Sequence, residues 1–202
     1  RLNRSLTGVG VRKTLKIIKK KHKELKIKKI KSGTKVFDWK VPEEWNVSEA
    51  YILDKNHRKI IDFKNNNLHL MSYSRPISKK LKKKELFKHL YSIKNKPTAI
   101  PYVTSYYEKN WGFSVSENQK RKIKQNYNNN DKFKAVIKSN FKKNGNLNYG
   151  ELLISGKSKK EILISTYICH PSMANNELSG PIVSMALIDF FKRKKLKMSL
   201  RF

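Results

Sequence analysis

The chain has 202 residues, and its 47 Lys and Arg against 15 Asp and Glu give a formal net charge of +32. Its single cysteine, Cys169, excludes a disulfide framework, and no apolar run approaches the ~20 residues that a transmembrane helix needs. The length suits one domain with a large insert or two small domains. Because a lone cysteine fits a reducing compartment, these features predict a cytoplasmic protein without a membrane partner.

The positive charge by itself is compatible with nucleic-acid binding, since lysines neutralise phosphates. Most of the basic residues are Lys, however, whereas Arg is the residue that contacts base edges in a bidentate way. The longest basic run, Lys13 to Lys31, contains no Phe, Tyr or Trp on which a base could stack. Joint enrichment in Lys, Asn and Ile indicates an AT-rich genome and solvated lysine surfaces, so we do not expect a nucleic-acid partner.

The first predicted element is an amphipathic helix over residues 9–23. Val11, Leu15 and Ile18 fall at positions i, i+4 and i+7, and lysines occupy the opposite face. Residues 25–30 mostly alternate between apolar and basic side chains, which is typical of a short strand. The chain is therefore expected to begin with a helix and a strand.

The composition changes after residue 34, because all three Trp and most of the other aromatic residues lie between residues 35 and 141. Turn residues divide this stretch into short pieces, which indicates short strands. The predicted elements are a β-hairpin of residues 50–54 and 59–63, strands at 68–74 and 102–106, and short helices at 76–93 and 117–124.

The end of the chain predicts a strand–loop–helix unit that follows a first strand at residues 147–154. Residues 161–169 form a nearly continuous apolar run, as expected for a strand that is buried on both faces of a parallel sheet. A loop at 170–178 leads to a helix at 179–194. The buried face of that helix is expected to consist of Ile182 or Val183, with Ala186, Leu187, Phe190 and Phe191.

His170 is the main candidate for chemistry, because it stands at the carboxyl end of the predicted buried strand, where α/β sheets form their sites. Asn176 and Glu177 follow just before the helix, so a short loop returns a carboxylate toward the imidazole. A histidine with a carboxylate is the beginning of a catalytic zinc site, which usually has three protein ligands. The spacing equally allows a histidine with a purely structural role, and Asn175 with Asn176 in an ordinary turn.

Cys169 stands directly before His170, and a thiol beside an imidazole can be a nucleophile. Cys169 also ends the apolar run, and adjacent residues of a strand point to opposite faces. We therefore interpret Cys169 as a core residue.

Residues 170–181, H-P-S-M-A-N-N-E-L-S-G-P, resemble the metal loop of the di-zinc aminopeptidase superfamily. In that loop a strand-end His and an Asn-Asp pair precede a Ser-Gly that opens a helix. The whole chain more closely resembles the aminopeptidase-like proteins found with bacterial polysaccharide-biosynthesis genes. The matching segments are Arg4–Leu15, Ser32–Trp45, Pro101–Tyr107, Trp111–Phe113 and Asn148–Leu152.

The resemblance implies an α/β fold with a zinc-exopeptidase-like α/β/α core that is incomplete in this sequence. Residues 1–34 and 146–202 would form the core, and residues 35–145 would form an inserted β-rich domain. The sequence would then be the N-terminal portion of a longer chain, in which later strands supply the remaining ligands and the general-base Glu. Four aromatic residues are candidate pocket walls or, alternatively, core of the insert: Trp39, Tyr106, Tyr107 and Trp111.

By resemblance, the function is a metal-dependent aminopeptidase-like hydrolase that acts on amide or peptide bonds and is linked to polysaccharide biosynthesis. The implied cofactor is zinc, with His170, Asn176 and Glu177 as candidate ligands, and the implied partner is a peptide or an aminoacyl-like small molecule. The superfamily's bridging Asp aligns with Asn176, whose amide cannot neutralise two dications as a carboxylate does. The first alternative is an inactive peptidase-fold binding module, and the second, less favoured one is a basic nucleic-acid-binding protein. A homo-oligomer is compatible with the sequence.

Overall fold

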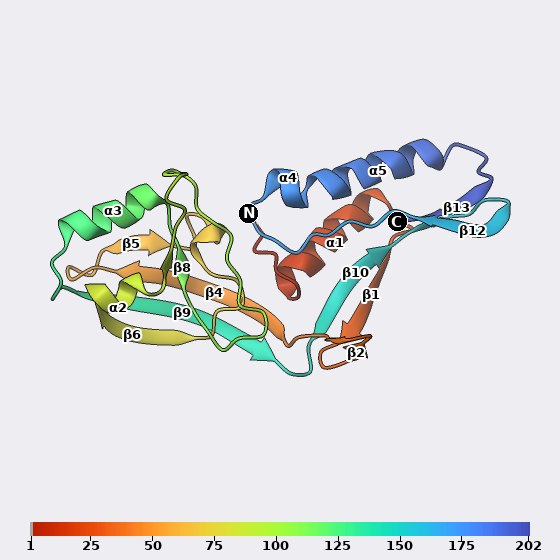
Figure 1. Ribbon diagram of the computed structural model, residues 1–202. Coiled ribbons are helices and arrows are strands. Elements are labelled where there is room, and N and C mark those ends of the chain that lie inside the picture. Colours follow the sequence, from red (N-terminus) through yellow and green to blue (C-terminus); the bar gives the residue numbers. More distant parts are fainter. Residues whose placement is uncertain (1) are drawn as a thin grey trace. The chain divides into compact units, whose positions relative to one another are not determined.

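The computed structural model describes residues 2–202, which form two compact units (Figure 1). We call the residues up to Glu44 together with Lys142–Phe202 the terminal unit, and Trp45–Phe141 the middle unit. The sequence placed domain boundaries at 34/35 and 145/146, whereas the structure divides the chain at 44/45 and 141/142. No helix in the described part of the chain is long and apolar enough to cross a membrane.

The terminal unit begins with helix α1, Val9–Lys21, which confirms the predicted amphipathic helix. Val11 and Leu15 are buried, and three lysines lie in the last turn, where positive charge interacts favourably with the helix dipole. Arg12, on the same helix, makes a bidentate ion pair with Glu44 at 2.8 Å for each bond. This pair fixes α1 to the point where the chain leaves the terminal unit.

Two small sheets and a two-stranded ribbon follow in the terminal unit. Strand β1, Lys26–Lys31, is confirmed and pairs antiparallel with β10, Asn146–Glu151. A second, three-stranded sheet has the order β11–β13–β12, and its β12–β13 pair is parallel. Its strands are β11 (Leu153–Ile154), β12 (Ser158–Leu163) and β13 (Met198–Arg201), and a two-stranded ribbon consists of β2 (Lys35–Val36) and β3 (Trp39–Lys40).

The apolar run at 161–169 differs from the prediction. Strand β12 ends at Leu163, and residues 164–169 continue without strand pairing. Leu163 is 69% exposed rather than buried. The reason is the position of β12 at the edge of its sheet, because β13 is its one hydrogen-bonded neighbour among the described residues.

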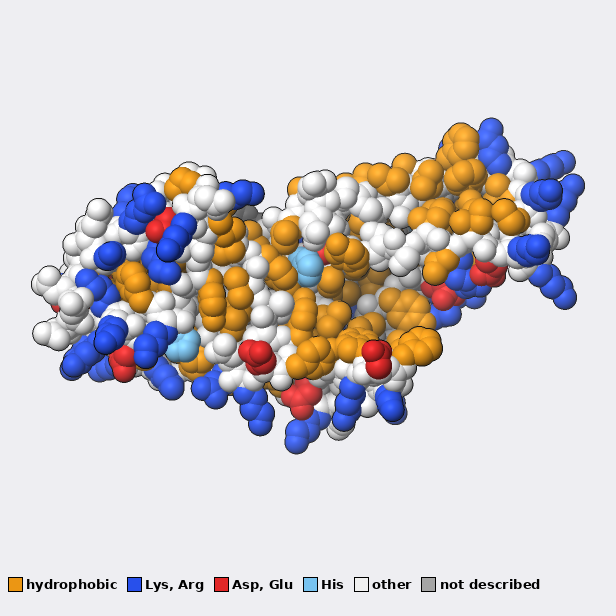
Figure 2. Space-filling view, in the orientation of Figure 1, with side chains coloured by type: hydrophobic (Ala, Val, Ile, Leu, Met, Phe, Trp, Pro, Cys, Tyr) orange, Lys and Arg blue, Asp and Glu red, His pale blue; other side chains and the backbone are white. Residues whose placement is uncertain are grey.

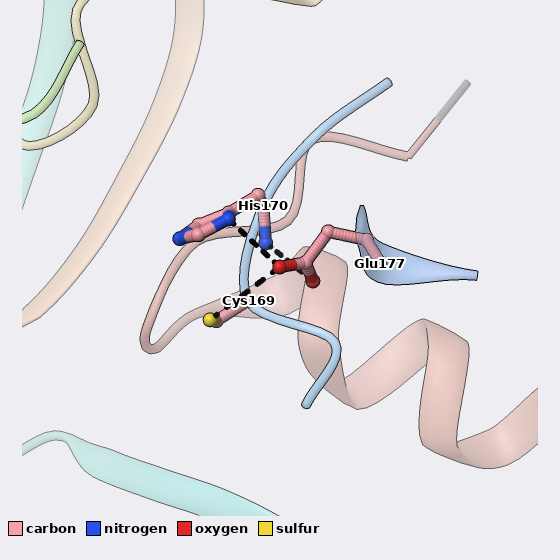
Figure 3. A group of neighbouring side chains, drawn as sticks. All are labelled: Cys169, His170 and Glu177. Atoms are coloured by element: carbon pink, nitrogen blue, oxygen red, sulfur yellow. Dashed lines mark hydrogen bonds and ion pairs between the residues drawn. The ribbon is translucent and has the colours of Figure 1, made fainter. Parts of the chain in front are cut away.

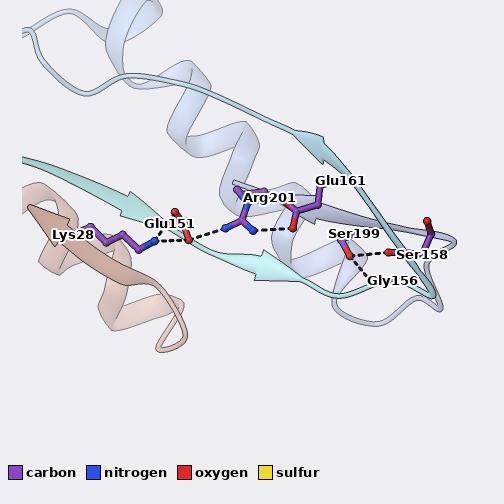
Figure 4. A network of polar contacts seen from close by, with 7 residues as sticks. All are labelled: Lys28, Glu151, Gly156, Ser158, Glu161, Ser199 and Arg201. Carbon is purple, nitrogen blue, oxygen red and sulfur yellow. Dashed lines mark hydrogen bonds and ion pairs between the residues drawn. The ribbon is translucent and has the colours of Figure 1, made fainter. Parts of the chain in front are cut away.

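A chain of polar contacts joins the two sheets of the terminal unit (Figure 4). Lys28 of β1 donates to Glu151 of β10 at 2.9 Å, and Arg201 of β13 donates to the same carboxylate at 2.7 Å. Arg201 also donates to Glu161 of β12 at 2.6 Å. One guanidinium therefore connects β10, β12 and β13, and we call these four residues the Arg201 network.

The last helices are α4, Ala174–Glu177, and α5, Ser179–Phe191. The helix predicted at 179–194 is confirmed, but its predicted buried face is wrong. The buried residues of α5 are Pro181, Ser184 and Ile188, and Ile188 packs with Leu25 and Leu152 in the core of this unit. The predicted residues Ile182, Val183 and Phe190 are more than half exposed, and hydrophobic side chains are visible along α5 in Figure 2.

The middle unit is built on a four-stranded sheet of order β5–β4–β9–β6. The predicted hairpin is confirmed by the antiparallel pair β4–β5, and the helix predicted at 117–124 is confirmed as α3. Ser116 and Gln119 form a capping box at the start of α3, which satisfies its first backbone donors. The bounds are β4 (Glu44–Leu53), β5 (Lys59–Asp62), β6 (Ile77–Lys82), β9 (Lys132–Lys142) and α3 (Glu117–Asn126).

The helix predicted at 76–93 is wrong. Residues 77–82 form strand β6, which pairs antiparallel with β9, so that Ile77 faces Ile137 and Leu81 faces Phe133. Only the short helix α2, Lys83–Phe87, follows, and then β7, Leu90–Tyr91, which pairs parallel with β8, Phe113–Ser114. Pairing with β9 outweighs the helical spacing of the leucines, which is a weak signal over so short a segment.

The strands predicted at 68–74 and 102–106 are also wrong. The first segment contains a 3-10 helix, Asn67–His69, and both segments form only isolated bridges, such as Ser72 with Thr104. Aromatic packing holds these loops instead. Tyr73, which is 1% exposed, stacks on Trp45 with ring centroids 5.5 Å apart and meets the edge of Tyr106 at 5.2 Å.

Candidate metal centre

The loop that follows residues 164–169 is held at both ends. Arg4, near the start of the chain, donates from Nε to the carbonyl oxygen of His170 at 3.0 Å. Pro171 is buried, and Ser172 adopts a positive φ of 52°, which turns the backbone sharply. The loop then enters α4, whose single turn places Glu177 back beside His170.

Glu177 contacts His170 through both carboxylate oxygens (Figure 3). Nδ1 of His170 lies 2.8 Å from Oε1, and the backbone N–H of His170 donates to Oε2 at 2.8 Å. Glu177 is fully buried, with no exposed surface, whereas the His170 side chain is 22% exposed. The carboxylate therefore lies behind the ring, and the ring lies at the surface.

Asn176 approaches the same ring nitrogen as Glu177. Its Oδ1 is 3.1 Å from Nδ1 of His170, and its Nδ2 donates to the hydroxyl of Tyr167 at 3.4 Å. The Tyr167 ring in turn meets the His170 ring edge-on at 6.0 Å between centroids. Asn176 and Tyr167 are both exposed, so this side of the ring is open to solvent.

Cys169 completes a group of three potential metal donors with His170 and Glu177, whose ligand atoms lie within 4.8 Å of one another. Sγ of Cys169 lies 3.9 Å from Oε1 of Glu177. Burial, with a smaller contribution from the charge of Glu177, raises the pKa of the Cys169 thiol to about 11. Near neutral pH it is therefore a thiol, which is a poor nucleophile and a poor metal ligand.

Arg4 is the residue of this site that sequence reasoning missed. It is 7% exposed, and burial lowers the pKa of its guanidinium, while the negative charge of Glu177 opposes that change. Its contact with His170 joins residues 166 positions apart. No local spacing reveals such a contact; the only signal was that Arg4 begins a segment that matches the aminopeptidase-like proteins.

The three predicted ligands, His170, Asn176 and Glu177, thus lie together. Their donor atoms can be compared with the ligand atoms that zinc prefers. Imidazole nitrogen and carboxylate oxygen are both zinc ligands, and a histidine whose Nδ1 faces a carboxylate presents Nε2 to a metal. The amide of Asn176 adds an oxygen without charge. These side chains fit the beginning of a zinc site, and that they bind a metal stays a prediction.

The four candidate wall residues do not gather in one unit. Trp39 lies in strand β3 of the terminal unit, and the other three lie in the middle unit. Trp111 is 2% exposed and stacks on His89 at 3.7 Å, and Tyr106 packs against Tyr73. These contacts favour the alternative interpretation of Trp111 and Tyr106 as core of the middle unit, while Tyr107 is exposed.

The chain is similar to a curated protein and to a solved structure, both from Clostridium acetobutylicum. It is 47% identical over 199 residues to a curated protein named for polysaccharide biosynthesis and an aminopeptidase-like domain, covering 98% of this chain and 44% of that protein. A crystal structure described as a peptidase is 46% identical, with a TM-score of 0.91 over 100% of this chain and 46% of that chain. The chain therefore spans about half the length of these relatives.

More distant structures share the fold. BSAP, a zinc aminopeptidase from Bacillus subtilis, is 12% identical with a TM-score of 0.56, over 99% of this chain and 56% of that chain. A peptidase M28 precursor from Shewanella amazonensis is 9% identical with a TM-score of 0.54, over 98% and 59%. The predicted aminopeptidase-like α/β fold is confirmed.

A family model described as a domain of unknown function, DUF4910, matches residues 1–202, the whole chain. Together with the high identity to the aminopeptidase-like protein of C. acetobutylicum, this match extends over both units. The chain belongs to the DUF4910 family of aminopeptidase-like proteins.

Proposed function

We propose that this chain supplies the first ligands of a zinc-dependent hydrolase that cleaves an amide bond in a peptide or aminoacyl-like substrate, in association with polysaccharide biosynthesis. The observation that carries the proposal is the double contact of His170 with the buried carboxylate of Glu177 at a solvent-accessible ring. The fold of zinc aminopeptidases supports it. So does the name of the C. acetobutylicum relative, which supplies the link to polysaccharides.

The residues of the loop have separate roles in this proposal. His170 would bind the metal through Nε2, and Glu177, which lies at Nδ1, would set the ring's tautomer and direction. The Oδ1 of Asn176 also lies at Nδ1, so it would orient the ring beside Glu177 and would have to turn to reach an ion at Nε2. A bound zinc ion would act as a Lewis acid and activate water for attack on the amide carbonyl. Arg4 would hold the loop in place through the carbonyl of His170.

The second candidate is a peptidase-fold binding module without catalysis. Asn176 favours it, because the position that aligns with a bridging Asp carries no charge here. Without that negative charge, the repulsion between two neighbouring dications is not offset at this position. The two candidates differ in measurable ways: a binding module would hold at most one zinc ion and would not cleave aminoacyl amides.

Zinc binding of the natural protein that carries this sequence tests the proposal. A competition titration against a chromogenic chelator gives the affinity of the unaltered protein and of His170→Ala. His57→Asn is the matched control, because His57 is an exposed histidine at a positive φ of 61°, which Asn tolerates. We expect His170→Ala to lower the affinity at least about tenfold and the control to leave it unchanged.

Cleavage of a library of aminoacyl p-nitroanilides, measured on the same preparations, separates the two candidates. Zinc-dependent cleavage that is lost in His170→Ala supports the hydrolase. Tight zinc binding without cleavage of any library member selects the binding module. The absence of zinc binding in the unaltered protein would overturn the hydrolase and favour the binding module.

A further inference from the structure

The geometry points to a binding site for a phosphorylated, hydroxyl-bearing small molecule of the sugar-phosphate class in the middle unit, at an open cavity of about 630 Å³. The cavity lies where β6 leads into α2, against the end of α3 and the loop that follows it. Its lining residues are Lys82, Lys83, Lys84, Glu85, Phe87, Lys124, Asn129 and Asn130. This site is independent of the candidate metal centre.

The cavity carries a strong excess of positive charge. Four of its lining residues are lysines, and its one carboxylate, Glu85, accepts the backbone N–H of Lys82 at 2.9 Å and so caps α2. Within residues 2–202, neither Lys82 nor Lys84 lies within ion-pair distance of a carboxylate, and both are exposed. Lysine and arginine side chains are visible over α2 and β6 in Figure 2.

One lysine has a structural role that shapes the cavity. Nζ of Lys83 donates to the backbone carbonyl oxygens of Lys124, at 3.1 Å, and Tyr127. These bonds hold the end of α3 and the following loop against α2. The nearby carboxylate of Asp131 is engaged by Lys55 at 3.2 Å and by the backbone of Asn128 at 2.8 Å. The remaining lysines of the cavity, Lys82, Lys84 and Lys124, are thus available to bind a ligand.

The sheet beside the cavity adds further positive charge, and its lysines face one another across two strands. In the β6–β9 register, Lys82 lies directly opposite Lys132, and Lys80 lies directly opposite Lys134. Like charges at directly opposed positions destabilise an antiparallel pair. Two such pairs follow each other along the sheet, and Lys82 belongs both to one pair and to the lining of the cavity. Unfavourable local arrangements of this kind are expected at functional sites. A bound anion would relieve the repulsion.

The other lining residues define the class of ligand. Lysine is a compact charge that binds phosphate without the planar geometry that arginine imposes. Asn129 and Asn130 offer amide donors and acceptors for hydroxyl groups, and Phe87 offers an apolar ring. The volume lies in the range of small-molecule pockets, roughly 300–1,000 Å³. A concave site of this size suits a sugar phosphate better than a polymer.

Isothermal titration with glucose 1-phosphate, inorganic phosphate and glucose tests the site on the intact protein. We expect glucose 1-phosphate to bind more tightly than phosphate, and glucose to show no binding. The double variant Lys82→Glu/Lys84→Glu should lower the affinity for glucose 1-phosphate at least tenfold. Lys13→Glu/Lys16→Glu is the matched control, because it changes the net charge equally at two exposed lysines of α1.

Three results would overturn the inference: no binding of glucose 1-phosphate at millimolar concentration, equal loss of affinity in the control, or binding of an anionic polymer alone. If circular dichroism shows that Lys82→Glu/Lys84→Glu does not fold, Lys84→Ala/Lys124→Ala replaces it, with the same tenfold loss expected. Because none of these residues lies in the terminal unit, failure here leaves the proposed zinc function unaffected, and the reverse also holds.

Discussion

His170 and Glu177 contact each other twice, once through the ring and once through the backbone, with both distances at 2.8 Å. One carboxylate oxygen faces the ring nitrogen, and the other accepts the backbone N–H of the same residue. A single helical turn, α4, supplies this arrangement by returning the chain seven positions later. The direction of the imidazole is therefore fixed by a residue that solvent does not reach.

Glu177→Ala is expected to destabilise the protein, because it removes the partner of two donors in a buried place. Leaving a buried hydrogen-bonding group without its partner costs about 1–3 kcal/mol, and with two donors affected we expect a loss of about 3 kcal/mol in the free energy of unfolding. Urea denaturation followed by circular dichroism gives the value. Glu49→Ala is the control, since Glu49 makes an exposed ion pair with Lys138, and its substitution should change stability little. Equal effects of the two variants would contradict the role given to Glu177.

Asn176→Asp is expected to raise zinc affinity at least about tenfold, because it adds a negative charge whose oxygen lies 3.1 Å from the imidazole Nδ1. A chelator competition titration at constant ionic strength measures the change. Asn175→Asp adds the same charge to the adjacent exposed position and serves as the control. If both substitutions raise the affinity equally, general electrostatic attraction explains the effect and position 176 has no special part.

The sequence correctly predicted the elements that depend on residues close together in the chain. The spacing of Val11 and Leu15 predicted α1, and the turn between β4 and β5 predicted their hairpin. The proximity of His170 and Glu177 was predicted for the same reason, since one short loop joins them. In each case the residues that make contact are close in the sequence.

The elements that depend on distant partners were predicted poorly. Strand β6 exists because β9 pairs with it some fifty residues later, and its leucines alone indicated a helix. Helix α5 is apolar on nearly every side, so periodicity did not reveal that Ile188 rather than Phe190 faces Leu25 and Leu152. The contact of Arg4 with the carbonyl oxygen of His170 joins residues 166 positions apart, and no local pattern encodes it.

Cys169 is expected to react slowly with iodoacetamide at pH 8. Its pKa is raised to about 11, mainly by burial and next by Glu177, so that the thiolate forms only as the pH rises toward that value. We expect an alkylation rate at least tenfold below that of free cysteine at pH 8, measured by mass spectrometry. Glu177→Gln removes one of the two causes and should speed the reaction. A fast reaction at pH 8 in the unaltered protein would restore the nucleophile interpretation.

Gly180→Ala tests how α5 packs on residues 164–169. A Cβ at position 180 would lie 1.9 Å from Oγ1 of Thr166, so the added methyl group cannot be accommodated without movement. We expect a loss of about 1–3 kcal/mol in the free energy of unfolding. Thr166→Gly in the same chain should recover part of that loss, because it removes the clashing side chain. Simple addition of the two single effects would show that the positions are not coupled.

Acid should weaken the Arg201 network. The hydrogen bond from Lys28 is the largest cause that lowers the pKa of Glu151, and the bond from Arg201 is the largest cause that lowers that of Glu161. A carboxylate with a lowered folded-state pKa contributes stability above its unfolded pKa, about 4.3, and this contribution is lost as the pH falls through the folded value. The urea midpoint should therefore fall between pH 6 and pH 3, and it should fall less in Arg201→Gln. Arg193→Gln, at an exposed position, is the control and should keep the full pH dependence. An unchanged pH profile in Arg201→Gln would show that other carboxylates determine acid stability.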